Sequence, residues 1–177
     1  MPLGSNRRQT RREGRREERS EERQTFGRGG DATRYQMRQK MVSIGDDFWI
    51  ENDRGERAFK VDGKALRIRK TLKFEDAQGN ELAKIQERVA RIRDTMKVEG
   101  PDGSTLATVK KAMITPLRER YTVSTAAGDL KIHGNILDHE YEMESDGHKV
   151  AEVSKKWFRV RDTYGVEIAQ GQEDIII

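Results

Sequence analysis

Residues 74–86 read FEDAQGNELAKIQ, and this stretch decides the fold because the chain repeats its plan twice more. Residues 98–110 read VEGPDGSTLATVK, and residues 143–155 read MESDGHKVAEVSK. In each copy an apolar residue and an acid precede a turn with a glycine, and an apolar-Ala-x-apolar segment follows the turn. Glycine supplies the positive φ that tight hairpin turns require. The plan therefore predicts a β-hairpin that the chain uses repeatedly.

Turn signals recur along most of the chain and predict six hairpins. The turns lie at 52–56, 76–81, 100–104, 125–129, 145–149 and 163–167. Six hairpins correspond to about a dozen short antiparallel strands. Closing such a sheet on itself removes its unpaired edges. The sequence therefore predicts an all-β fold, a closed antiparallel β-barrel of about twelve strands.

The segment LRIRKTLKF at 66–74 shows which face of a strand would be apolar. Leu66, Ile68, Leu72 and Phe74 take one parity, and Arg67, Arg69 and Lys73 take the other. Successive side chains of a strand point to opposite faces, so this pattern indicates a half-buried strand with a basic outer face.

The first 34 residues differ from the rest in composition. They hold ten arginines and six acids, a surplus of four that accounts for the whole formal net charge of +4. From Gly4 to Thr25 there is no apolar residue. A segment without apolar residues cannot bury a face, so residues 1–34 are predicted to form a disordered Arg/Glu-rich tail, with a marginal solvated helix as the alternative. Residues 35–177 are the predicted domain.

The composition also excludes some classes of protein and site. The chain has no cysteine, which excludes disulfides and zinc-thiolate sites. Its longest apolar runs are three residues, too short for a transmembrane helix, and no signal-peptide core is visible. A cytoplasmic location is the expectation, with peripheral attachment to a membrane as an open option.

The sequence offers no motif for catalysis, for a metal or for a cofactor. His133, His139 and His148 stand six and nine residues apart without a tight carboxylate cluster, a poor spacing for a metal site. The serines include no Gly-x-Ser-x-Gly elbow. Carboxylates such as Asp53, Asp76 and Asp102 lie at turns, where they are expected to bond local backbone. The protein is predicted not to be an enzyme.

Three longer stretches resemble the LURP-one-related family. They are YQMRQKMVSIGDDFWIENDRGERAFKVDGKAL at 35–66, GNILDHEYEM at 134–143 and AEVSKKWFRVRDTYGVEIAQGQEDIII at 151–177. The resemblance implies a fold shared with Tubby C-terminal domains and, more distantly, with phospholipid scramblases. In that family a closed barrel surrounds a C-terminal hydrophobic helix, which follows the stretch that is 162–168 here.

The resemblance implies that the central helix starts near residues 172–174, so that the helix is missing or truncated after Ile177. Large voids inside a protein are costly, so something is expected to fill the barrel. Three explanations remain open: an incomplete chain, a helix supplied by a partner chain, or a short variant with a collapsed barrel.

Basic residues suggest a face for an anionic ligand, although the solvated outside of a barrel is the favoured explanation for them. They are Arg67, Arg69, Lys73, Lys155, Lys156, Arg159 and Arg161. Tubby domains bind phosphoinositides, so the resemblance favours a binding module for anionic lipid headgroups. The open alternatives are an apolar ligand carried in the barrel lumen, and docking of nucleic acid or of an acidic protein partner by the Arg-rich tail. Interleaved glutamates weaken the case for nucleic acid.

Overall fold

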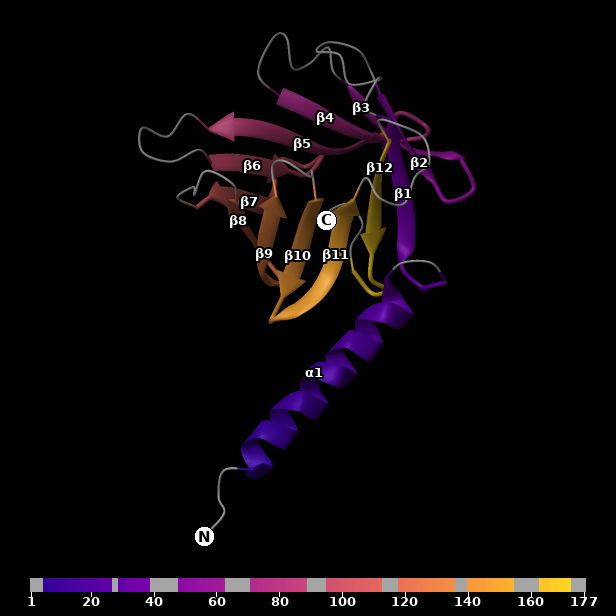
Figure 1. The fold of residues 1–177 in the computed structure, drawn as a ribbon. Coiled ribbons are helices and arrows are strands. Elements are labelled where there is room, and N and C mark those ends of the chain that lie inside the picture. The colour runs from indigo at the N-terminus through magenta and orange to yellow at the C-terminus, as the bar shows by residue number, and fades with distance from the viewer. Residues whose placement is uncertain are drawn as a thin grey trace.

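The computed structural model of the chain describes residues 5–26, 29–38, 48–62, 71–88, 95–112, 118–135, 140–154 and 163–172. Within these ranges the chain forms one helix and twelve strands (Figure 1). They are α1 (Ser5–Thr25), β1 (Thr33–Arg38), β2 (Phe48–Asn52), β3 (Arg57–Asp62), β4 (Thr71–Asp76), β5 (Glu81–Arg88), β6 (Thr95–Glu99), β7 (Thr105–Lys111), β8 (Arg118–Thr125), β9 (Gly128–Asn135), β10 (Glu140–Ser145), β11 (His148–Ser154) and β12 (Thr163–Ile168).

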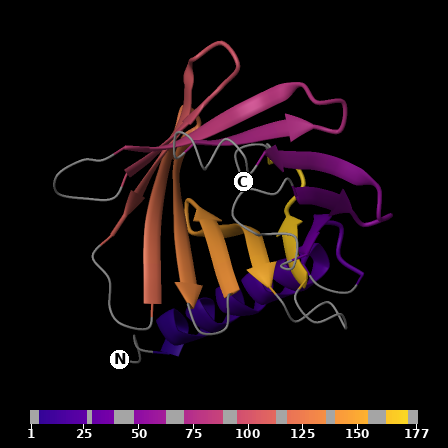
Figure 2. The same ribbon diagram turned by 90° about the horizontal axis from the view of Figure 1, so that it is seen from above.

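The strands form a closed antiparallel barrel, as predicted. Each strand pairs with its neighbours in the sequence, and β1 pairs with β12 to complete the ring. Figure 2 shows the strands following one another around this ring. Because neighbours run antiparallel, the starts of odd-numbered strands and the ends of even-numbered strands lie at one end of the barrel. We call it the turn end, and the opposite end the loop end.

Five of the six predicted turns join consecutive strands at the turn end, β2 to β3, β4 to β5, β6 to β7, β8 to β9 and β10 to β11. The sixth prediction is wrong, because Gly165 lies inside β12 and pairs with Gln36 on one side and Ser154 on the other. Its neighbours Thr163, Tyr164 and Val166 favour strands, and pairing on both edges of β12 outweighs the turn signal of one glycine.

The tight turns repeat one local chemistry. At the β4–β5 turn the Oδ1 of Asp76 accepts hydrogen bonds from the backbone N–H groups of Gln78 (2.9 Å) and Asn80 (2.8 Å), and Gly79 has φ +88°. Asp102 accepts likewise from the N–H of Ser104 at 2.9 Å, so both predicted turn roles are confirmed. At the β2–β3 turn the acceptor is Asn52 instead of Asp53.

A β-bulge explains why the repeated sequence places an apolar residue and then an acid before the turn. The pairing register shifts between Ile50 and Glu51, Phe74 and Glu75, Val98 and Glu99, and Met143 and Glu144. Each apolar residue of these pairs lines the barrel interior. Each glutamate follows on the outer face, where, for example, Glu75 meets Lys60 at 3.4 Å. A bulge bends and twists a strand, so the four bulges curve the wall at one level.

Residues 5–25 form α1, which is the helical alternative considered for the N-terminal segment. Figure 1 shows α1 outside the barrel, with its C-terminal end against the turn end. Phe26 follows the helix and is 8% exposed, and the Lys149 ammonium lies 4.5 Å from the centre of its ring. The first apolar residue after the charged segment therefore anchors the helix to the β10–β11 hairpin.

The pairing of β1 with β12 closes the barrel and is reinforced by an ion pair whose carboxylate is buried. Six residue pairs form between these strands, including Arg34 with Glu167. The Arg34 Nε lies 2.6 Å from the Glu167 Oε1, and the Glu167 side chain is 3% exposed. Removing one partner of a buried pair leaves an uncompensated charge, which is strongly destabilising.

We therefore expect Arg34→Ala to lower the free energy of unfolding by about 3 kcal/mol, because the buried carboxylate of Glu167 loses its ion pair with Arg34. The control is Lys73→Ala, since the Lys73 side chain is 40% exposed and lies 3.4 Å from Glu81. That change should cost less than about 1 kcal/mol. Urea unfolding followed by circular dichroism measures both, and equal losses would contradict the role given to the closure pair.

Candidate functional site

Of the seven basic residues predicted to form an anionic-ligand face, Lys73 lies within the described residues. Its ammonium lies 3.4 Å from Glu81, which also binds Lys84 at 2.8 Å. The other six lie outside the described residues: Arg67, Arg69, Lys155, Lys156, Arg159 and Arg161. Their part in binding stays a prediction.

A different group of cations stands out on the outer wall of the barrel. Thr122 of β8 pairs with Lys110 of β7 on one side and with Lys131 of β9 on the other. Arg120 lies two residues before Thr122, on the same face of β8. All three basic side chains are exposed, and none makes an ion pair with another of the described residues. We call Lys110, Arg120 and Lys131 the β7–β9 cation patch. Elsewhere on the described wall, Lys60, Lys84 and Lys97 each lie within 4 Å of a glutamate.

Sequence reasoning missed the β7–β9 cation patch, although the outward parity of each cation is readable. Val109, Tyr121 and Ile132 point inward, so their neighbours Lys110, Arg120 and Lys131 point outward. What the sequence does not contain is the register that sets the three cations side by side, with Lys131 opposite Glu144 but not ion-paired to it. His133 and Glu144 border the patch and lie 3.7 Å apart.

The inner face of the barrel has an apolar middle. Tyr35, Phe59 and Phe74 pack in a row, with ring centres 5.3 and 4.9 Å apart. Together with aliphatic side chains from β5 to β12, they surround a hollow of about 300 Å³. Small side chains such as Ala83 and Ala107, each 2% exposed, widen the space. The middle of the lumen therefore offers an apolar surface.

A polar cluster lies on the same inner face, one layer nearer the loop end. Lys111 donates a hydrogen bond to the Oε1 of Glu119 (2.9 Å), and the Tyr121 hydroxyl donates to its Oε2 (2.8 Å). Tyr141 lies beside the same carboxylate, whose charge helps to raise the pKa of the Tyr141 hydroxyl. Tyr141 pairs with Gly134, where a Cβ would overlap the tyrosine ring. The glycine thus makes room for Tyr141, and we call Lys111, Glu119, Tyr121 and Tyr141 the inner cluster.

The charges of the inner cluster stabilise one another. The hydrogen bonds from Lys111 and Tyr121 lower the pKa of Glu119 below its ordinary 4.5. The hydrogen bond to Glu119 raises the pKa of Lys111 above its ordinary 10.5. Burial, and then the neighbouring carboxylate, raise the pKa values of Tyr121 and Tyr141 above 10.0. At neutral pH the inner cluster therefore contains one cation, one anion and two neutral phenols.

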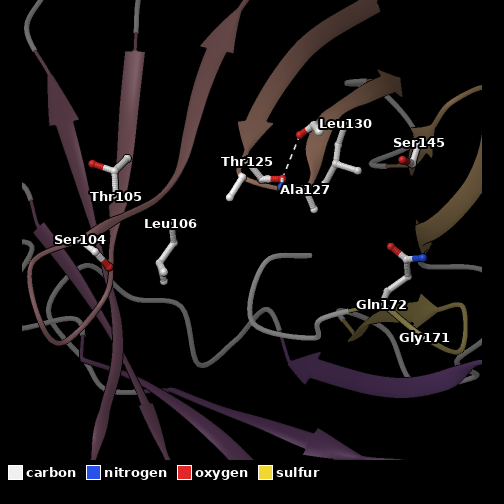
Figure 3. A pocket seen from close by; sticks show the side chains of 11 residues that line it. Ser104, Thr105, Leu106, Thr125, Ala127, Leu130, Ser145, Gly171 and Gln172 are labelled. Carbon is white, nitrogen blue, oxygen red and sulfur yellow. Dashed lines mark hydrogen bonds between the residues drawn. The ribbon is translucent and has the colours of Figure 1, made fainter.

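A second hollow, of about 500 Å³, lies at the turn end (Figure 3). Its polar lining includes Ser104, Thr125, Ser145 and Gln172, and its apolar lining includes Leu106 and Leu130. The Thr125 hydroxyl is used locally, because it donates to the Gly128 carbonyl (2.9 Å) and accepts from the Ala127 N–H (3.1 Å). No charged side chain lines this hollow among the described residues, which gives it little basis for selecting a ligand.

Two further observations apply to the described part of the chain. No three His, Asp or Glu side chains there are grouped as metal ligands would be. His139 lies outside the described residues. Among those same residues, no helix has the length and apolar character needed to cross a membrane.

The chain belongs to the LURP-one-related family, whose model matches residues 33–177. It is 29% identical over 142 residues to Uncharacterized protein YxjI of Bacillus subtilis strain 168, covering 80% of this chain and 84% of that protein. A protein from Arabidopsis thaliana solved by X-ray crystallography has a similar fold, with a TM-score of 0.55 and 16% identity, over 77% of this chain and 80% of its own. At that identity the likeness concerns the fold alone.

The inner cluster should make stability depend on pH at both ends of the scale. The pKa of Glu119 is lower in the folded protein than its ordinary value of 4.5. Glu119 therefore contributes stability above pH 4.5, and this contribution is lost as the pH falls through the pKa of the folded state. The raised pKa of Tyr121 means that its contribution is complete below 10.0 and is lost as pH rises further.

We expect the stability difference between wild type and Glu119→Gln to be largest near neutral pH and to shrink below pH 4.5, the ordinary pKa of a glutamate. The stability difference between wild type and Tyr121→Phe should instead shrink above pH 10.0, the ordinary pKa of a tyrosine. Thermal unfolding across pH measures both. Differences that do not change with pH would show that the inner cluster is not the source.

Proposed function

We propose that this LURP-one-related barrel is a non-enzymatic binding module for anionic lipid headgroups at a membrane surface, and that the β7–β9 cation patch makes the contact. The observation that carries the proposal is that Lys110, Arg120 and Lys131 are exposed together without a carboxylate partner among the described residues. Unpaired cations retain their full attraction for phosphate oxygens, whereas paired ones have lost most of it.

The spacing of the three cations suits a phosphate group. Neighbouring strands are about 4.8 Å apart, so the backbones at Lys110 and Lys131 lie roughly 10 Å apart. Arg120 is displaced by about 7 Å along β8, since two residues of a strand rise that far. Long side chains at these positions can converge on one headgroup, with the Arg120 guanidinium able to bind two phosphate oxygens at once.

The patch is favoured over the N-terminal segment as an anion-binding surface. In the described C-terminal half of α1, Glu18, Glu21 and Glu22 lie beside His148 and Lys149 at the start of β11. These acids would repel a phosphate, and the helix is already docked through Phe26. Docking of nucleic acid by the arginines of residues 1–34 stays an alternative prediction.

The test is flotation of the full chain with vesicles of phosphatidylcholine, alone or with anionic phosphatidylserine or a phosphoinositide. Binding should require the anionic lipid and weaken with salt. Each cation near an anionic surface contributes about 1 kcal/mol, so Lys110→Gln, Arg120→Gln and Lys131→Gln together should reduce binding roughly a hundredfold.

The matched control removes three cations that are already ion-paired on another part of the wall, by Lys60→Gln, Lys73→Gln and Lys84→Gln. Both triple variants change the net charge equally, so a general charge effect would reduce their binding alike. The control should bind within a few-fold of wild type. An equal loss in both, or binding to phosphatidylcholine alone, would contradict the proposal.

A further inference from the structure

The charges of α1 follow a spacing that places like beside like. Arginines recur four residues apart at Arg7, Arg11, Arg15, Arg19 and Arg23, and again at Arg8, Arg12 and Arg16. Glutamates do so at Glu13, Glu17 and Glu21, and again at Glu18 and Glu22. Residues four apart are neighbours on a helix, and like charges at that spacing repel. The charged residues of α1 that stand four apart therefore destabilise the helix unless an oppositely charged partner is present.

The helix also separates the two charges, which are interleaved in the sequence. We give the name α1 arginine stripe to Arg16, Arg19 and Arg23. Each residue of a helix is turned by about 100° from the one before, so the stripe is centred about 140° from the side that carries Glu18, Glu21 and Glu22. All three arginine side chains are exposed, and none makes an ion pair with another of the described residues.

The attachment of α1 to the barrel fixes which side faces outward. The three acids lie against the start of β11. The N–H of Ala32 donates to the Thr25 carbonyl at 3.0 Å, and Phe26 and Ala32 are both buried, so the last turn of the helix is tied to the segment that leads into β1. Figure 1 shows α1 projecting away from the barrel. The arginine stripe therefore faces solvent.

We propose that the α1 arginine stripe binds the phosphate backbone of a nucleic acid duplex. A guanidinium group can bind two phosphate oxygens at once. The helix rises about 10 Å from Arg16 to Arg23, which matches about three phosphates along one strand of a duplex. Such a partner would also remove the repulsion between neighbouring arginines. This inference does not depend on the β7–β9 cation patch.

The composition of α1 favours a duplex over a single strand. Proteins bind single strands largely by stacking the bases on aromatic side chains. From Gly4 to Thr25 the chain has no aromatic residue, and Phe26 is buried beneath Lys149. The helix also lacks the apolar face with which an interfacial helix enters a membrane. A duplex requires neither, because its phosphates are already held in regular rows on its outside.

The acids of α1 would repel a phosphate at the docked side of the helix, but the stripe lies on the other side. A helix with its side chains is about 10–12 Å thick, and the Debye length at physiological ionic strength is about 8 Å. The docked acids are therefore largely screened from a duplex that contacts the stripe. Glu13 and Glu17 lie between the two sides.

The test is fluorescence anisotropy of a short labelled DNA duplex titrated with the full chain. Each phosphate contact contributes about −0.9 to the slope of log affinity against log salt, so three contacts predict a slope of about −3 or steeper. Arg16→Gln, Arg19→Gln and Arg23→Gln together should reduce the slope by about 3 and weaken binding at low salt roughly a hundredfold. Glutamine has nearly the helix propensity of arginine, and circular dichroism checks that α1 persists.

A matched pair of single variants separates the stripe from net charge. Ser20 lies four residues after Arg16 and three before Arg23, so Ser20→Glu should pair with both arginines and weaken duplex binding about tenfold. Gly14→Glu makes the same change of charge near the side of the docked acids, where an added Cβ meets nothing within 4 Å. It should weaken binding less than about threefold. Equal losses would contradict the inference.

A crossed comparison separates this inference from the proposed lipid binding. The triple variant of the stripe should still float with anionic vesicles, and the triple variant of the β7–β9 cation patch should still bind the duplex. Duplex binding that is lost only in the patch variant would place the nucleic acid on the barrel and overturn the inference. The inference also fails if wild type does not bind the duplex at low salt, or binds the single strand of the same sequence more tightly.

Discussion

The wall of this barrel is a single β-sheet, so each strand has to present apolar side chains to the lumen and charged side chains to the outside. Val98 and Glu99 meet this requirement at the end of β6, where a bulge separates the inward residue from the outward one. Side chains on the outer face stand about 4.8 Å apart across strands, so charged side chains on neighbouring strands interact. Pairs such as Lys60 with Glu75 follow from that spacing. A group of exposed cations without ion pairs, such as the β7–β9 cation patch, therefore departs from the pattern of the described wall and is a candidate binding surface.

The two faces also give adjacent residues different chemical roles. Lys110 and Lys111 are neighbours in β7, yet one is exposed on the outer wall and the other is bonded to Glu119 inside the barrel. A substitution at one position need not affect the other, because the strand separates them.

Much of the fold was predictable because its determinants are local. The hairpin plan of residues 74–86 contains its own turn chemistry, and Asp76 and Gly79 act as that chemistry requires. The turn predicted at Gly165 was wrong because the sequence alone does not distinguish a glycine in a strand from a glycine in a turn. The distinction comes from the pairing of Gly165 with Gln36 and Ser154.

The candidate sites were less predictable because they depend on register. Glu119 is one of 31 acids in the chain, and no local pattern reveals that Lys111, Tyr121 and Tyr141 surround it. The β7–β9 cation patch likewise exists only once β7, β8 and β9 are aligned. Composition and periodicity determine which way a side chain points, but not which side chain from another strand stands beside it.

The closure of the ring has a consequence for the order in which the barrel folds. Each hairpin joins residues close in sequence, whereas Arg34 and Glu167 are 133 residues apart. Contacts over such separations form slowly, because a long chain segment has to be ordered first. The hairpins should therefore assemble into an open arc, with β1 and β12 as its two unpaired edges. An arc of this kind could pair with a second chain before it closes. Arg34 and Glu167 put a charge on each of these edges, which disfavours pairing between like edges and favours the union of β1 with β12.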